Sequence, residues 1–139
     1  MKYLLDTNIC IYIIKKKPLE IFNKLVTINI SDVGISSITL SELEYGVEKS
    51  QYPDRNRLAL LEFLSPIEIY NFDDFAAKEY GIIRTEFEKK GNLIGPLDML
   101  IAAHAKSLRL ILVTNNENEF KKVSGLKIEN WTKFGYNAS

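Results

Sequence analysis

Short runs of apolar residues alternate along the chain with longer segments whose apolar positions recur every three to four residues. The short runs have the length of buried β-strands, and the longer segments have the period of amphipathic helices. The predicted strands are residues 3–5, 33–37, 67–70 and 110–113, with an edge strand at 128–131. Runs that are apolar throughout and separated by helices are typical of a parallel sheet covered on both faces, so we predict an α/β fold.

Residues that favour helix ends punctuate the segments between the strands. Asp, Asn, Ser, Thr or Pro stands near the start of most of them, and Gly91 follows the longest. The predicted helices are residues 9–14, 18–26, 39–50, 53–64, 73–90, 95–103 and 117–123. Thr39 and Glu42 have the spacing of a capping box, which we expect to open the third helix. The pattern contains no repeat and no long linker, so we predict a single domain over residues 1–139.

The composition agrees with one compact domain. The chain has 139 residues, 46% of them hydrophobic, which is enough for a core of normal size. No apolar run approaches the roughly 18 residues of a membrane helix, and the start of the chain lacks a signal-peptide pattern. The lone Cys10 cannot form an internal disulfide. We therefore predict a cytoplasmic protein without membrane association. Its net charge of zero gives no general attraction to nucleic acid, although local basic patches could still contact phosphates.

Three acidic residues occupy positions where burial is expected. Asp6 separates two apolar runs, Glu42 lies one turn into the third helix, and Asp98 is surrounded by apolar and small residues. Each also has an ordinary explanation, as a helix cap, as the second member of a capping box, or as a charge favoured by the helix dipole. The predicted sheet nevertheless brings these segments together, because ligands of parallel sheets bind beyond the carboxyl ends of the strands.

Three acids at one site would repel one another unless a positive charge lay between them. Arg84 and His104 are possible partners for Asp98, but neither is an obvious one. A divalent cation would remove the repulsion, and oxygen donors alone favour Mg²⁺ or Mn²⁺ over zinc. Such a cation polarises a phosphoryl oxygen and activates water, which predicts phosphodiester hydrolysis. With one histidine, no nucleophile elbow and no glycine-rich phosphate loop, Ser–His–Asp catalysis and P-loop nucleotide binding are poorly supported.

Four stretches of the chain match one protein family in the family's order. They are LLDTNI at residues 4–9, SSITLSELEYG at 36–46, GPLDMLIAAHA at 95–105 and LVTNNENEF at 112–120. Together they resemble the PIN-domain ribonucleases, and specifically the VapC-type toxins of bacterial type II toxin–antitoxin pairs. The resemblance extends over essentially the whole chain.

The resemblance implies a PIN-like α/β/α sandwich with a central, mostly parallel sheet of about five short strands, whose last few residues can be flexible. It implies an Mg²⁺- or Mn²⁺-dependent endoribonuclease that cuts structured cellular RNA, such as tRNA or rRNA, and so inhibits translation. The implied partners are RNA, a VapB-type antitoxin and a second copy of the chain in a homodimer. Asp6, Glu42 and Asp98 match the catalytic, metal-binding acids, and Asn8 and Thr114 match polar positions beside them. We therefore expect the first acid to face the other two and not to be an essential cap.

The fourth acidic position departs from the family pattern. Asn116 stands where many PIN domains have Asp, so it can offer a metal a carbonyl oxygen but no charge. Glu119, three residues later, is the candidate for the missing carboxylate. Among basic residues, Arg84 is the first candidate to contact RNA phosphates, followed by Lys49 and Lys106, for which a solvated surface is the alternative.

Two other functions stay open at this level. A PIN-like module that binds RNA or a protein partner would cleave poorly if Asn116 weakens the site. A phosphotransfer domain with Asp6 as nucleophile ranks lower, because such domains usually have a second Asp two residues later, where this chain has Asn8. Apolar residues of the first two helices could also line a groove for an amphipathic antitoxin helix, and helix 73–90 is the candidate dimer contact.

Overall fold

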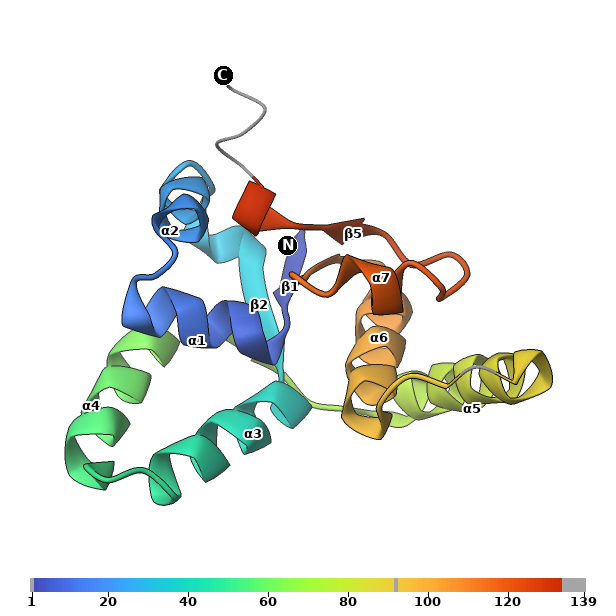
Figure 1. Ribbon diagram of the computed structural model, residues 1–139, viewed down its shortest axis with the longest axis horizontal. Helices are drawn as coiled ribbons and strands as arrows, with labels where there is room; N and C mark the ends of the chain where they lie inside the picture. The colour runs from blue at the N-terminus through green and yellow to red at the C-terminus, as the bar shows by residue number, and fades with distance from the viewer. Residues whose placement is uncertain (1, 92, 134–139) are drawn as a thin grey trace.

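Five parallel strands form one sheet at the centre of the molecule (Figure 1). The computed structural model describes residues 2–91 and 93–133, so the expected flexibility of the last few residues concerns a part of the chain outside it. The strands lie in the order β3 (Glu68–Tyr70), β2 (Val33–Ser36), β1 (Tyr3–Leu5), β4 (Ile111–Val113) and β5 (Ile128–Glu129). Every neighbouring pair is parallel, so all the carboxyl ends lie at one edge of the sheet.

Helices cover both faces of this sheet (Figure 1). On one face lie α1 (Thr7–Lys15), α2 (Leu19–Val26), α3 (Ser37–Glu48) and α4 (Pro53–Leu64). On the other lie α5 (Asp74–Lys90), α6 (Pro96–Leu108) and the short α7 (Glu117–Phe120). Two 3₁₀ helices, Ile30–Asp32 and Trp131–Lys133, complete the described elements. The predicted α/β/α sandwich is confirmed, and the sheet is parallel throughout.

The two central strands divide their side chains between two cores. Leu4 and Leu112 pack with the α5 and α6 side chains, whereas Leu5 and Val113 pack with those of α1, α3 and α4. This follows from the two-residue period of a strand, which turns neighbouring side chains to opposite faces. The strands are apolar throughout because both faces of the sheet are covered.

Several element boundaries differ from the predicted ones. The third helix begins at Ser37 with the Ser36 hydroxyl as its cap, so the predicted capping box of Thr39 and Glu42 is wrong. The predicted edge strand ends at Glu129, where the chain turns into a 3₁₀ helix. None of the helices in the described part combines the length and hydropathy that a membrane span needs.

Candidate active site

Asp6 stands where β1 ends and α1 begins, and it serves both elements. Its backbone N–H donates to the Val113 carbonyl across the sheet at 3.0 Å, and its Oδ1 accepts from the Ile9 backbone N–H at 3.0 Å. The side chain therefore does cap α1, in addition to its predicted position at the site. Only 5% of Asp6 is exposed, so its charge is held in a largely dry environment.

Burial raises the pKa of Asp6 from 3.8 to about 6. Hydrogen bonds from the Thr114 side chain and the Ile9 backbone oppose this rise, while the negative charges of Asp98 and Glu42 add to it. The three acids that the sequence singled out therefore lie near enough to influence one another electrostatically. Near neutral pH the Asp6 carboxyl is mostly ionised, at a cost in free energy that these two hydrogen bonds offset only in part.

Glu42 reaches the same region from the second turn of α3. The Thr7 hydroxyl donates to Glu42 Oε1 at 2.6 Å, which joins the first residue of α1 to α3 across 35 positions of sequence. The buried Thr39 hydroxyl lies 3.5 Å from the Thr7 hydroxyl. Thr7 thus fixes the direction of the Glu42 carboxylate, a role that sequence reasoning missed. The only sequence signal was a hydroxyl residue directly after the first acid.

Asp98 lies in the first turn of α6, directly after Gly95 and Pro96 begin that helix. It is half-buried, and its pKa is raised by burial, then by the charges of Glu42 and Glu119. Neither proposed cationic partner contacts it. Arg84 instead binds Glu88 and Tyr80 on its own helix, and His104 binds Ser36.

The end of β4 supplies the fourth side of the site. Thr114 is fully buried, and its hydroxyl accepts from the Asn116 backbone N–H at 2.9 Å while its side chain also binds Asp6. Asn116 and Glu119 are both half-buried, and Glu119 acts electrostatically on Asp98. Asn8, by contrast, is exposed on α1.

The basic residues predicted to contact RNA have partners outside the acidic site. Lys49 lies over the Tyr45 ring, with its Nζ 4.8 Å from the ring centroid. Lys106 lies near the far end of α6 from Asp98, and its Nζ is 3.8 Å from Glu79 Oε2. Within the described residues, no Lys, Arg or His forms an ion pair with the three acids.

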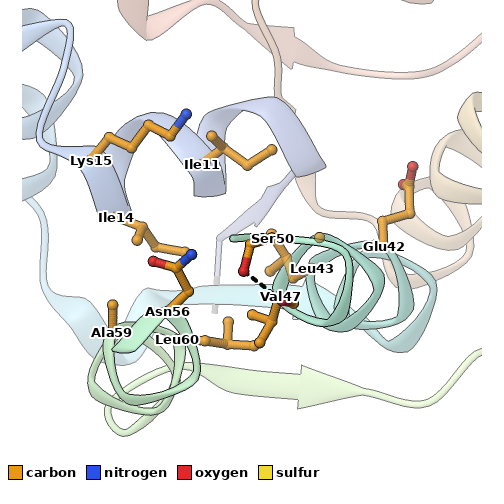
Figure 2. Close-up of a pocket in the computed structure, with 11 residues that line it drawn as sticks. Ile11, Ile14, Lys15, Glu42, Leu43, Val47, Ser50, Asn56, Ala59 and Leu60 are labelled. Carbon is orange, nitrogen blue, oxygen red and sulfur yellow. Dashed lines mark hydrogen bonds between the residues drawn. The ribbon is translucent and has the colours of Figure 1, made fainter. Parts of the chain in front are cut away.

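A mostly aliphatic groove of about 310 Å³ has Glu42 among its lining residues (Figure 2). Its walls come from α1, α3 and α4 and include Ile14, Leu43 and Leu60. Glu42 stands at one end, with its carboxylate turned away from the other lining side chains, and Lys15 borders the α1 wall (Figure 2). The same glutamate thus belongs both to the acidic cluster and to the rim of an apolar groove.

Comparison with known proteins agrees with this geometry. The family model described as PIN domain matches residues 3–126. The chain belongs to the PIN-domain family. This PIN domain is similar to a protein named ribonuclease VapC2 from Haemophilus influenzae, with 49% identity over 94% of the chain and 98% of the relative. It is also similar to a Shigella flexneri protein named tRNA(fMet)-specific endonuclease VapC, with 46% identity over 95% of the chain and 99% of the relative.

Among solved structures, the PIN domain is similar to the one described as VapBC2 from Rickettsia felis bound to a DNA fragment from their promoter. The TM-score is 0.87 with 46% identity, and the match covers 94% of this chain and 99% of the other. The sequence-based assignment to this family is therefore confirmed.

The donor chemistry of the PIN domain fits a hard divalent cation. All the candidate ligands are oxygens. Burial raises the pKa of both Asp6 and Asp98, and the charge of Glu42 adds to both rises, so a nearby cation would stabilise the ionised carboxylates. As they stand, no three His, Cys, Asp or Glu side chains in residues 2–91 and 93–133 converge closely enough to hold a metal ion. That spacing is expected from carboxylates that repel one another, and the donor set itself suits Mg²⁺ or Mn²⁺.

Proposed function

We propose that this chain is an Mg²⁺- or Mn²⁺-dependent endoribonuclease that acts as a toxin in the cytoplasm. The observation that carries the proposal is the cluster of Asp6, Glu42 and Asp98. They come from three separate elements and lie at the carboxyl edge of the sheet. The charges of Asp98 and Glu42 raise the pKa of Asp6, and the charge of Glu42 raises the pKa of Asp98, with no basic side chain of the described residues paired to them. A cluster that is costly in itself is typical of a functional site.

The proposed roles follow from the contacts of each side chain. Asp6 and Asp98 would hold the cation, with Glu42 as third ligand in the direction set by the Thr7 hydroxyl. Asn116 would contribute only a neutral oxygen. A divalent cation at such a site polarises a phosphoryl oxygen and activates water for attack on the phosphodiester. The buried position of Asp6 limits access of bulk water, which strengthens its electrostatic interactions.

Structured RNA is the proposed substrate, and tRNA is the first candidate within that class. Relatives that share 46% and 47% of their residues with this chain are named tRNA(fMet)-specific endonucleases. Cleavage of an initiator tRNA would inhibit translation at its first step. The homodimer that the family resemblance implies is part of the same proposal.

A VapB-type antitoxin is the proposed protein partner. Structural neighbours of this chain are described as VapBC complexes. The aliphatic groove between α1, α3 and α4 suits the apolar face of an antitoxin helix. Glu42 lines one end of this groove and also belongs to the acidic cluster. An arginine carried from that helix toward the acids would supply the missing positive charge and block the site.

A binding module with weak cleavage is the second candidate, because Asn116 replaces an acid and because the acids do not converge as they stand. One experiment separates the two. Wild type, Asp6→Asn and Asp98→Ala, free of antitoxin, are incubated with total bacterial RNA and Mg²⁺ or a chelator, and the cut ends are sequenced. Glu62→Gln, an exposed acid on α4, is the matched control.

We expect discrete cuts by wild type and by the Glu62 variant with metal, and none by the two site variants. Absence of cleavage by folded wild type would refute the nuclease and favour the binding module.

A further inference from the structure

A buried hydrogen bond joins the two helices that carry Glu42 and Asp98. The Ser36 hydroxyl, at the start of α3, lies 2.8 Å from Nδ1 of His104 in α6. Ser36 is fully buried and His104 is 1% exposed, so water does not compete for this bond. It is a contact between side chains 68 positions apart in the sequence, and it crosses from one helix layer to the other.

The hydrogen-bond partners define the direction of this bond. The Ser36 oxygen already accepts from the Ile38 backbone N–H at 3.0 Å, so its single proton is free to be donated to Nδ1. Burial lowers the pKa of His104, although the charge of Asp73 and a hydrogen bond to the backbone of Asn71 oppose this. A neutral ring that accepts at Nδ1 and donates from Nε2 toward Asn71 satisfies every partner. We therefore assign that tautomer.

Aromatic rings fix the imidazole on its other sides. The Phe72 and Tyr70 rings meet it edge-on, with centroids 5.4 Å and 6.4 Å away. Tyr70 is itself held against β2, since a Cβ on Gly34 would lie only 2.7 Å from Tyr70 Cε2. These ring contacts restrain the imidazole, and its hydrogen bond links it to the start of α3.

We propose that Ser36 and His104 form a positioning pair that sets the spacing between Glu42 and Asp98. The inference rests on the proposed metal-dependent function. Ser36 caps α3 and precedes Glu42 by six residues, and His104 follows Asp98 by six residues in α6. A rigid helix carries the position of each member of the pair to the acid on the same helix, less than two turns away. Neither member touches the proposed cation.

A directional bond has an effect that apolar packing lacks. Aliphatic side chains would fill the same space but would allow small rotations of α6 against α3, whereas a buried hydrogen bond loses its geometry when either helix turns. The three acids repel one another, so this restraint works against a force that drives the two helices apart. The cost of breaking a buried polar pair makes the restraint strong.

Two substitutions of His104 separate its two hydrogen bonds. In His104→Asn, the amide oxygen takes the position of Nδ1 and still accepts from Ser36. In His104→Gln, the amide takes the position of Nε2 and keeps only the contact toward Asn71. Ser36→Ala removes the donor but also the side-chain cap of α3, so the comparison of the two His104 variants decides. Ser41→Ala is the matched control, because Ser41 is an exposed residue of α3 whose hydroxyl donates to the Ser37 carbonyl at 3.0 Å, within the same helix.

The first readout is the affinity of each purified chain for Mn²⁺ alone, measured from the paramagnetic resonance signal of the free ion. We expect His104→Gln and Ser36→Ala to bind Mn²⁺ about 10-fold more weakly than wild type, as is common when a group that orients a ligand is lost. His104→Asn and Ser41→Ala should bind like wild type. Equal affinity in His104→Gln and wild type, or equal loss in His104→Gln and His104→Asn, would overturn the proposal.

The second readout needs no metal and therefore separates this proposal from the nuclease itself. Spin labels at the exposed positions Tyr45 and Leu97 report the distance between α3 and α6, with Cys10 replaced by Ala and the labelled chain diluted with unlabelled chain. We expect a broader or shifted distance distribution in His104→Gln and Ser36→Ala only. An unchanged distribution in both folded variants refutes the positioning role. If wild type bound no Mn²⁺ while these distances changed, the positioning pair would stand and the metal-dependent function would fail.

Discussion

Replacing Asp6 by Asn should make the metal-free chain more stable while removing its activity. Asp6 combines two roles that oppose each other, since it caps α1 and also buries a charge beside Glu42 and Asp98. Asn caps a helix about as well as Asp, so the hydrogen bond to the Ile9 backbone N–H is expected to survive. The negative charge disappears, and with it the carboxylate that Asp6 would contribute to the cation site.

The expected gain follows from the pKa of the buried carboxyl. A rise from 3.8 to about 6 corresponds to about 3 kcal/mol of destabilisation at pH 7, at about 1.4 kcal/mol per pKa unit. The folded chain keeps the Asp6 proton to higher pH than the unfolded chain does. Between pH 3.8 and about 6, the folded chain therefore binds more protons than the unfolded chain. The contribution of Asp6 to stability is therefore complete below pH 3.8 and is lost as the pH rises through about 6.

Urea unfolding in the presence of a chelator, at several pH values from about 3.5 to 8, measures this gain as a difference in unfolding free energy. We expect Asp6→Asn to exceed wild type by about 2–3 kcal/mol above pH 7 and to equal it near pH 4. Glu62→Gln should show no such pH-dependent difference, because Glu62 is exposed. A variant that is no more stable than wild type at pH 7.5, or whose gain does not vary with pH, would refute the reasoning.

Three further predictions concern other parts of the site and its rim. Thr7→Val removes the donor to Glu42 and should slow RNA cleavage about 10-fold, whereas Thr7→Ser should keep the wild-type rate in the same gel assay. Asn116→Asp adds a fourth carboxylate and should tighten Mn²⁺ binding about 10-fold, measured from the free-ion resonance signal; unchanged binding would place this residue outside the metal site. Ala59→Arg fills the groove and should weaken antitoxin binding at least about 10-fold in a titration while leaving RNA cleavage unchanged; equal loss of both would contradict a separate docking groove.

Local chemistry was sufficient to predict most of the elements. The long helix ends where predicted, because Gly91 adopts a φ of 69° that ends the helix at low steric cost. Pro53 begins α4 at the first helical position, and the apolar runs around Leu4 and Leu112 form the two central strands. In these cases the residues that decide the structure are neighbours in sequence.

The errors share a physical cause, which is competition from distant partners. Thr39 and Glu42 have the spacing of a capping box, but Ser36 caps the helix three residues earlier. Glu42 is thereby free to accept from Thr7, which lies far away in the sequence. His104 has no short-range signal at all, because its partners come from β2 and from the segment after β3. Contacts of this kind depend on how the sheet is assembled, so no local pattern predicts them.

The electrostatics of the acidic site connect its proposed activity with its proposed inhibition. The chain has 18 basic residues, yet among the described residues none forms an ion pair with Asp6, Glu42 or Asp98. The free energy stored in this arrangement is released by whichever positive charge enters, because neutralisation relieves both the burial of charge and the repulsion. Binding of a divalent cation and binding of an arginine from a partner protein would both be favoured by this same release of free energy. Mutual exclusion of cofactor and inhibitor therefore requires no conformational switch in the chain.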